Sequence, residues 1–230
     1  MRNLLALATA VVLSGSAHAV LLYDQAPHAP GAAGGNGFSA WDDGVTYDRT
    51  VADDFIVGAG GWTVNMVDTK GVWNATPYAR DPLSGFKVQF WQDAGNVPGL
   101  TPFSNQTSTL VTRGATSIGT WFGRQGYNWD VAITPVTLTA GKWWVSITAV
   151  DPLNFYQLTA TSVQNTEAHL REFRTGAGYP IGSWGSATSV FGAANDVAFS
   201  IHGDAVPEPA TMAALGLGVA ALLRRRRARS

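Results

Sequence analysis

The sequence predicts an all-β fold, an antiparallel β-sandwich or jelly roll, with an N-terminal signal peptide before it and a C-terminal transmembrane helix after it. Charged residues make up only 13% of the 230 residues, whereas glycine (26 residues) and aromatic residues (11%) are abundant. Such a composition suits pleated surfaces that are buried on one side. Several segments also alternate between apolar and polar residues with a period of two, which is typical of half-buried strands.

The alternating segments are separated by turn signals that contain Gly, Pro, Asn or Asp. Pro135 lies inside one of them, and because proline cannot donate a hydrogen bond to a sheet, it predicts an edge strand or a bulge there. The short segment 166–173 (TEAHLREF) is the one candidate helix. No repeat or internal linker is evident, so we expect a single domain over residues 20–205. The predicted strands are 51–57, 62–69, 86–91, 131–139, 143–150, 155–161 and 196–202.

The N-terminus, residues 1–19, has the features of an export signal. Arg2 supplies a positive start, residues 4–13 form an apolar core, and Ala17 and Ala19 occupy the two key positions of a small-residue cleavage site. We therefore expect signal peptidase to cut after Ala19. An uncleaved anchor is the alternative, but the apolar run is too short to span a bilayer. Because the chain has no cysteine, the exported domain must be held together by its core rather than by disulfides.

The C-terminus, residues 206–230, combines an apolar stretch with a basic end. The apolar residues 210–223 would form a helix of about 21 Å, which is shorter than a hydrocarbon core of about 30 Å. Arginines follow directly at 224–227, and their side chains can reach the membrane interface and extend the span. The positive-inside tendency places these arginines in the cytoplasm. We expect this helix to anchor the exported domain to the inner membrane.

The order of these features resembles the PEP-CTERM sorting signal of Gram-negative bacteria that make extracellular polysaccharide. The residues that carry the resemblance are Pro207, Glu208 and Pro209, then the apolar helix, then Arg224, Arg225, Arg226 and Arg227. The resemblance implies recognition by an exosortase, a membrane-embedded enzyme similar to a cysteine transpeptidase. It further implies processing near the Pro-Glu-Pro motif and delivery to the cell surface or extracellular matrix. A plain C-terminal anchor is the alternative.

The body of the chain resembles the uncharacterised exported β-sandwich domains that often precede such tails. The segments that carry this looser resemblance are 51–57 (VADDFIV), 60–73 (GGWTVNMVDTKGVW), 86–99 (FKVQFWQDAGNVPG) and 195–203 (NDVAFSIHG). No catalytic residue is known for that group, so the resemblance implies a fold and no chemistry.

The chemistry-bearing residues of the body form no recognisable catalytic motif. His28, His169 and His202 lack zinc-type spacing, and no cysteine nucleophile exists. Most of the basic excess lies in the tail, which leaves the body acidic and argues against nucleic acid as a partner. These observations favour a non-catalytic structural or adhesive role in the envelope or in an exopolysaccharide matrix. A carbohydrate-binding module that contacts extracellular polysaccharide is the main alternative, and a secreted hydrolase with an aspartate pair is the third.

No cofactor is expected, although aspartates could hold a structural calcium ion. The densest acidic stretch is 42–54, and Asp53 within it, with Asp196 before the last strand, is the candidate ligand pair. Adjacent strand residues point to opposite faces, so Asp53 and Asp54 cannot easily share one ion. Solvated turn aspartates are the favoured interpretation.

Tryptophan is the other excess, with nine residues. Trp62 and Trp143 are in register with aliphatic neighbours, so we expect them in the core. Trp91, Trp144, Trp121 and Trp129 are candidates for stacking on sugar rings, the first two because polar residues share their strand face and the others because they lie in a Gly-rich segment. The alternative is that loops cover both faces of the sandwich.

Overall fold

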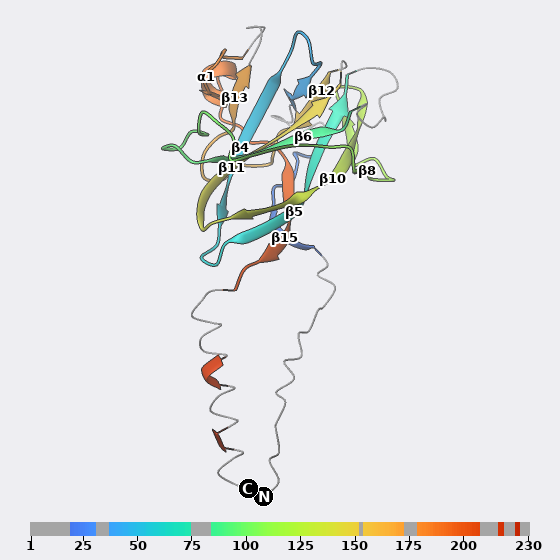
Figure 1. The fold of residues 1–230 in the computed structure, drawn as a ribbon. Helices are drawn as coiled ribbons and strands as arrows, with labels where there is room; N and C mark the ends of the chain where they lie inside the picture. The colour runs from blue at the N-terminus through green and yellow to red at the C-terminus, as the bar shows by residue number, and fades with distance from the viewer. Residues whose placement is uncertain are drawn as a thin grey trace, which may run out of the picture.

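The computed structural model describes residues 19–30, 37–74, 84–151, 154–172, 179–207, 216–218 and 224–225. Within them the chain forms two sheets that pack face to face (Figure 1). The first sheet follows the order β1 (Val20–Asp24), β15 (Phe199–Ala205), β5 (Trp62–Trp73), β10 (Arg124–Leu138) and β8 (Val111–Arg113), with β12 (Phe155–Leu158), β2 (Gly37–Ser39) and β9 (Gly119–Trp121) attached beside it.

The named strands of the second sheet pair antiparallel except for one short parallel pairing. This sheet follows the order β14 (Gly185–Ser186), β13 (His169–Glu172), β4 (Arg49–Val57), β11 (Gly141–Val150), β6 (Phe86–Gln92) and β7 (Ser104–Ser108). The short β3 (Trp41–Asp42) pairs with β11 in parallel. One short helix, α1 (Ala187–Phe191), lies beside β13 and β14.

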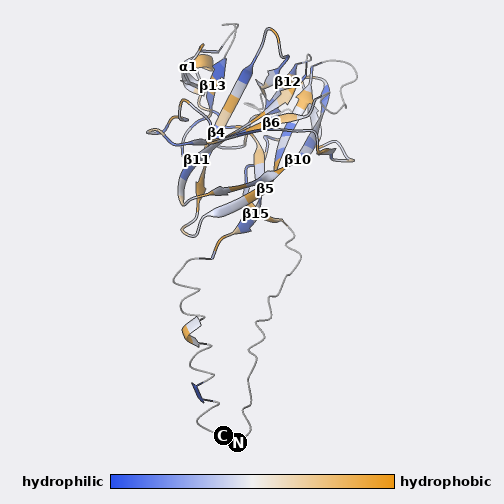
Figure 2. Cartoon of the chain, viewed as in Figure 1, coloured by the Kyte–Doolittle hydropathy of each residue, from blue (hydrophilic) through white to orange (hydrophobic). Residues whose placement is uncertain are grey.

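The core lies between the two sheets and is rich in aromatic side chains. Phe55 of β4 stacks on Trp62 of β5, with ring centroids 5.9 Å apart, and its edge meets Phe199 of β15 at 6.4 Å. The ring centroids of Phe86 in β6 and Trp129 in β10 lie 6.5 Å apart. Hydrophobic and hydrophilic positions are interspersed along β4 and β10, as expected for strands whose two faces differ (Figure 2). The all-β sandwich predicted from alternation is therefore confirmed.

All seven predicted strands overlap observed strands: β4, β5, β6, β10, β11, β12 and β15. The pairing of β10 with β5 shifts register between Ala132 and Val136, so the bulge predicted from Pro135 is confirmed. The pairing of β10 with β8 ends at Val131, so around Pro135 the described strand pairs with β5 alone, and the edge position predicted as the alternative holds locally as well. Polar edge strands such as β7 carry little alternation of hydrophobicity, and for that reason they were not predicted.

The predicted helix at 166–173 is wrong. Residues 169–172 form β13, which pairs with β4 so that Leu170 lies opposite Val51. Leu170 enters the core there, and the pairing with β4 outweighs a local helical preference. The observed helix α1 begins after Ser186, whose hydroxyl accepts a hydrogen bond from the backbone N–H of Ser189, and ends at Gly192 with φ 77°.

The predicted transmembrane helix at 210–223 falls outside the described residues, except for the helical residues 216–218. In the parts of the chain that the structure describes, no helix reaches the length and apolar character needed to cross a membrane.

Candidate functional site

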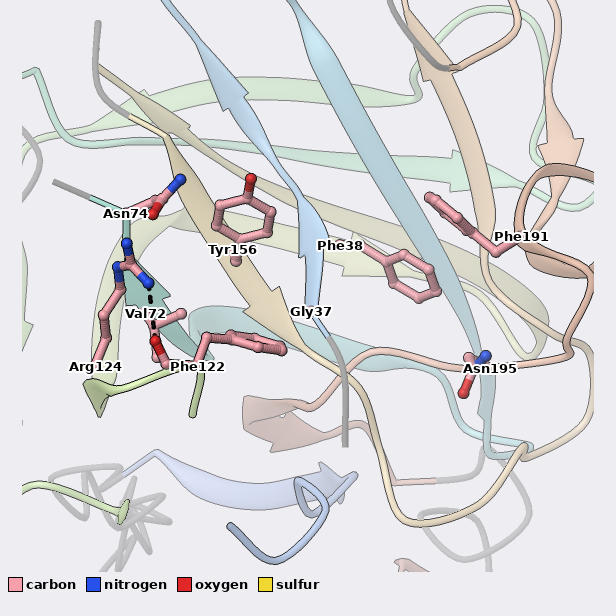
Figure 3. A pocket seen from close by; sticks show the side chains of 9 residues that line it. All are labelled: Gly37, Phe38, Val72, Asn74, Phe122, Arg124, Tyr156, Phe191 and Asn195. Atoms are coloured by element: carbon pink, nitrogen blue, oxygen red, sulfur yellow. Dashed lines mark hydrogen bonds between the residues drawn. The ribbon is translucent and has the colours of Figure 1, made fainter. Parts of the chain in front are cut away.

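A pocket of about 520 Å³ opens between the first sheet and α1 (Figure 3). Its volume lies in the range of small-molecule binding sites, about 300 to 1,000 Å³. Arg124 and Asn74 lie at one end, Phe191 and Asn195 lie at the other, and Gly37 lies between them. The described lining residues are Gly37, Phe38, Val72, Asn74, Phe122, Arg124, Tyr156, Phe191 and Asn195.

The pocket is lined by aromatic rings from four separate elements. Phe38 of β2 is buried and contacts the ring of Phe191 from α1 at 5.3 Å. Phe122 comes from the turn between β9 and β10, and Tyr156 comes from β12. Phe122 and Phe191 are 51% and 52% exposed, which is unusual for such large apolar side chains. Exposed rings that converge on one cavity indicate a binding surface.

The four tryptophans predicted to stack on sugar rings are buried, so the expectation of exposed indoles is wrong. Trp91 and Trp144 are 0% exposed because segments outside the sheet cover that face. The ring of Trp184 meets Trp91 edge-on at 5.2 Å, and the indole N–H of Trp144 donates to Asp93 Oδ1 at 2.9 Å. The alternative of loop-covered sheet faces is the correct one for this pair.

The other two tryptophans are buried for a different reason. Trp129 belongs to the main core, where its ring meets Phe155 edge-on at 5.4 Å. Trp121 packs against Val72 and Tyr156 directly behind the pocket. Its neighbour Phe122 takes the exposed position instead. The Gly-rich segment therefore carries an exposed, pocket-lining aromatic residue one position after the predicted one. Trp143 is buried and Trp62 packs against the core, as predicted.

The last strand of the domain leads directly into the C-terminal segment. β15 pairs with β1, so that Val20 lies opposite Gly203. The backbone N–H of Val206 donates to the carbonyl oxygen of Gly61 at 2.9 Å, and exposed Pro207 follows. Because proline has no N–H, the ladder cannot continue through Pro207. The two ends of the domain lie side by side, and the chain leaves the sheet at Pro207.

Some of the predicted sorting and cleavage residues can be placed. Ala19 is exposed just before β1, and Arg224 and Arg225 are exposed and helical. The remaining predicted residues, Ala17, Glu208, Pro209, Arg226 and Arg227, lie outside the described residues.

A comparison with protein families matches residues 205–227, the segment that begins where β15 ends. The chain carries a PEP-CTERM protein-sorting motif. The motif implies an exported protein that reaches the cell surface through a membrane-anchored intermediate and an exosortase-type membrane enzyme. Curated proteins and solved structures give no significant match to the chain.

The body of the chain also contains a buried group of carboxylates. Asp53 and Asp54 are 0% exposed and Asp196 is 1% exposed. Asp53 shares the inward face of β4 with Phe55, and its Oδ2 accepts the backbone N–H of Val197, two residues before β15, at 2.7 Å. Asp54 points to the other face, where Lys142 Nζ lies 2.8 Å from its Oδ2. Asp53 therefore connects β4 to the segment that leads into β15.

Burial governs the protonation of these aspartates. Burial first, and the neighbouring Asp196 carboxylate second, raise the pKa of Asp53 well above its usual range. Burial likewise raises the pKa of Asp196 to about 7, although hydrogen bonds from Gln164 and Gln25 act in the opposite direction. Both groups are therefore protonated in the folded state at pH values where the unfolded chain has lost these protons.

The structure brings the predicted calcium ligands Asp53 and Asp196 close enough for their charges to interact. Asp53 Oδ1 accepts the backbone N–H of Asp54, and Oδ2 accepts that of Val197, so N–H donors occupy both oxygens. Within the described ranges, no group of three or more His, Cys, Asp or Glu side chains is placed to hold a metal ion. Calcium at this position stays a prediction.

We expect Asp196→Asn to stabilise the protein at neutral to alkaline pH. Between pH 4 and 7 the folded state binds more protons than the unfolded state, so the free energy of unfolding of the wild type falls as pH rises. The variant has no carboxyl group at position 196 to titrate, so it does not lose this stability. Its free energy of unfolding relative to the wild type should rise by about 2 to 4 kcal/mol between pH 4 and 8. Urea unfolding across this range measures the difference.

Asp24→Asn is the matched control of opposite sign. Although partial burial acts the other way, the Ser200 hydroxyl and the Lys70 ammonium lower the pKa of Asp24. The ionised Asp24 carboxylate therefore stabilises the fold at pH values above the pKa that Asp24 has in the unfolded chain. The Asp24→Asn variant should lose stability relative to the wild type as pH rises. A pH-independent difference for Asp196→Asn would contradict the protonation assigned to the buried group.

Proposed function

We propose that this exported, surface-sorted protein is a non-catalytic structural or adhesive component of the cell envelope or of an exopolysaccharide matrix. Signal peptidase releases the domain at Val20, the inner membrane holds the C-terminal helix, and the exosortase-type enzyme then processes the tail. The single observation that carries the proposal is the sorting motif that follows directly on the last strand of a compact sandwich.

The topology of the domain supports an outward display. β5 begins at Trp62, opposite Ala205 where the tail starts, and runs for 12 residues to Trp73. At about 3.3 Å per residue this strand spans about 36 Å. Asn74, at its far end, lines the pocket, and Figure 1 places α1, β13 and β12 at the end opposite β15. A tether at the tail would therefore leave the pocket facing away from the membrane.

The distribution of carboxylates supports a non-catalytic role. Glycoside hydrolysis needs two carboxylates on opposite sides of a substrate cleft. The described residues that line the pocket include no aspartate or glutamate. Asp53 and Asp196 approach each other but are buried away from solvent. Asp68 of β5 lies opposite Asp130 of β10, and neither lines this pocket.

A matrix role can be tested in the native host by deleting the chain and measuring how much extracellular polysaccharide sediments with the cells. We expect a smaller sedimenting fraction, restored by the wild-type chain. A chain truncated after Val206 keeps the described domain and loses the sorting motif, and it should not restore the fraction. An unchanged fraction in the deletion strain would refute a matrix role.

A further inference from the structure

We propose that the pocket between β2, β12, α1 and the β9–β10 turn binds a saccharide that carries one carboxylate, such as a uronic acid residue of an otherwise neutral polysaccharide. This inference goes beyond the proposed function. The pocket and the sorting segment are separate parts of the chain, so a failure of ligand binding would leave the sorting of the protein unaffected.

The aromatic rings favour a ligand with flat apolar faces. Phe122, Tyr156 and Phe191 are each at least partly exposed, and all three line the cavity. The C–H faces of a pyranose ring pack on such aromatic faces, while its hydroxyl groups lie around the rim. A purely apolar ligand would make no use of the carboxamides of Asn74 and Asn195 at the two ends of the pocket.

The polar residues favour hydroxyl groups together with one negative charge. The carboxamides of Asn74 and Asn195 can each donate and accept hydrogen bonds, as sugar hydroxyls do. Arg124 is the one ionised residue among the lining residues that the structure describes. Its Nη1 donates to the carbonyl oxygen of Phe122 at 2.9 Å, which holds the guanidinium at the pocket wall (Figure 3). A guanidinium matches a carboxylate through paired N–H donors.

The backbone at Phe122 supports a role for its ring. Phe122 and Gly123 form a two-residue turn between the paired residues Trp121 and Arg124, with φ values of 54° and 72°. Turns with two positive φ values favour Asn-Gly, and a bulky residue at the first position is strained. The strain brings an exposed phenyl ring to the pocket wall, which a more favourable asparagine would not provide.

The small residue between the rings keeps the floor of the pocket open. A Cβ atom at Gly37 would lie 3.1 Å from the Cβ of Tyr156 and 3.6 Å from Cε2 of Phe122. Any larger side chain at this position would enter the space between these two residues. Glycine at position 37 therefore keeps a side chain out of this part of the pocket floor.

Isothermal titration calorimetry with the purified full chain in mild detergent tests the proposal. The probes are cellobiouronate and cellobiose, which differ in a carboxylate on one ring. We expect cellobiouronate to bind at least about tenfold more tightly, because its carboxylate adds a charge-assisted pair with the guanidinium of Arg124. Arg124→Gln should reduce the affinity for cellobiouronate to that for cellobiose.

Phe122→Asn separates binding from folding. Because asparagine relieves the strained turn, the melting temperature should rise by about 2 to 4 °C. Affinity for cellobiouronate should nevertheless fall about tenfold or more. Phe103→Ala and Arg113→Gln, which alter a similarly exposed phenylalanine and an arginine outside the pocket, should leave binding unchanged.

Three results would overturn the proposal. The first is that cellobiouronate does not bind at millimolar concentration, and the second is that the two sugars bind with equal affinity. The third is that both Arg124→Gln and Phe122→Asn leave the affinity for cellobiouronate unchanged. The last result would place any saccharide site elsewhere on the protein.

Discussion

Phe199→Ala is expected to lower the free energy of unfolding by about 3 to 5 kcal/mol. Phe199 is 0% exposed on β15, and its ring lies 5.3 Å from Tyr23 and 6.4 Å from Phe55. It therefore contributes to the packing of both sheets and of β1 at once. Removing the ring would leave a cavity between rigid strands that cannot collapse to fill it. Urea unfolding of the variant and the wild type measures the change.

Phe103→Ala is the control for this prediction. Phe103 is 52% exposed outside the main core, so its loss should change the free energy of unfolding by less than about 1 kcal/mol. A change below about 1 kcal/mol for Phe199→Ala as well would contradict the placement of β15 in the sandwich core.

Replacing Pro207, Glu208 and Pro209 together with alanine is expected to abolish processing of the tail. In a host with the exosortase-type enzyme, the wild-type protein should begin at Val20 and lose the residues after the Pro-Glu-Pro region. Pro207 has no N–H to continue the strand ladder, and proline in this region disfavours a helix, so we expect a processing enzyme to reach it. The triple variant should keep its full tail and remain in the inner membrane. Intact mass and cell fractionation measure both outcomes.

A host without the enzyme and the variant Arg229→Ala are the controls. The wild type should stay uncut in that host, whereas Arg229→Ala, which lies beyond the matched residues 205–227, should be processed normally. A tail that stays uncut with and without the enzyme would mean that it acts as a plain membrane anchor.

The strand prediction succeeded where one face of a strand is buried against the other sheet. β6, β11 and β15 contribute to the main core, and their segments alternate in the sequence. It failed for β13, since the short segment 169–172 becomes a strand through its pairing with β4. A partner distant in sequence decided that element, and local propensity carries no information about such a partner.

The candidate glycan site shows a similar limit at the level of single residues. Period-two alternation placed Trp91 on the polar face of β6, but it could not show that Trp184 covers that face. In the segment TWFGRQG it did not distinguish buried Trp121 from exposed Phe122. The pocket joins residues from 37 to 195, so no local pattern could have identified it.

The sequence by itself was enough to predict an export signal, to locate the sorting motif and to predict the sandwich class. Each of these depends on the local order of residues or on the two-residue period of apolar and polar positions. The tertiary structure alone decided which aromatic rings are exposed, that Asp53 and Asp196 share a buried site, and that the two ends of the domain meet at β1 and β15. These features depend on which distant segments pack together, and packing is governed by the whole core rather than by any single stretch of the chain.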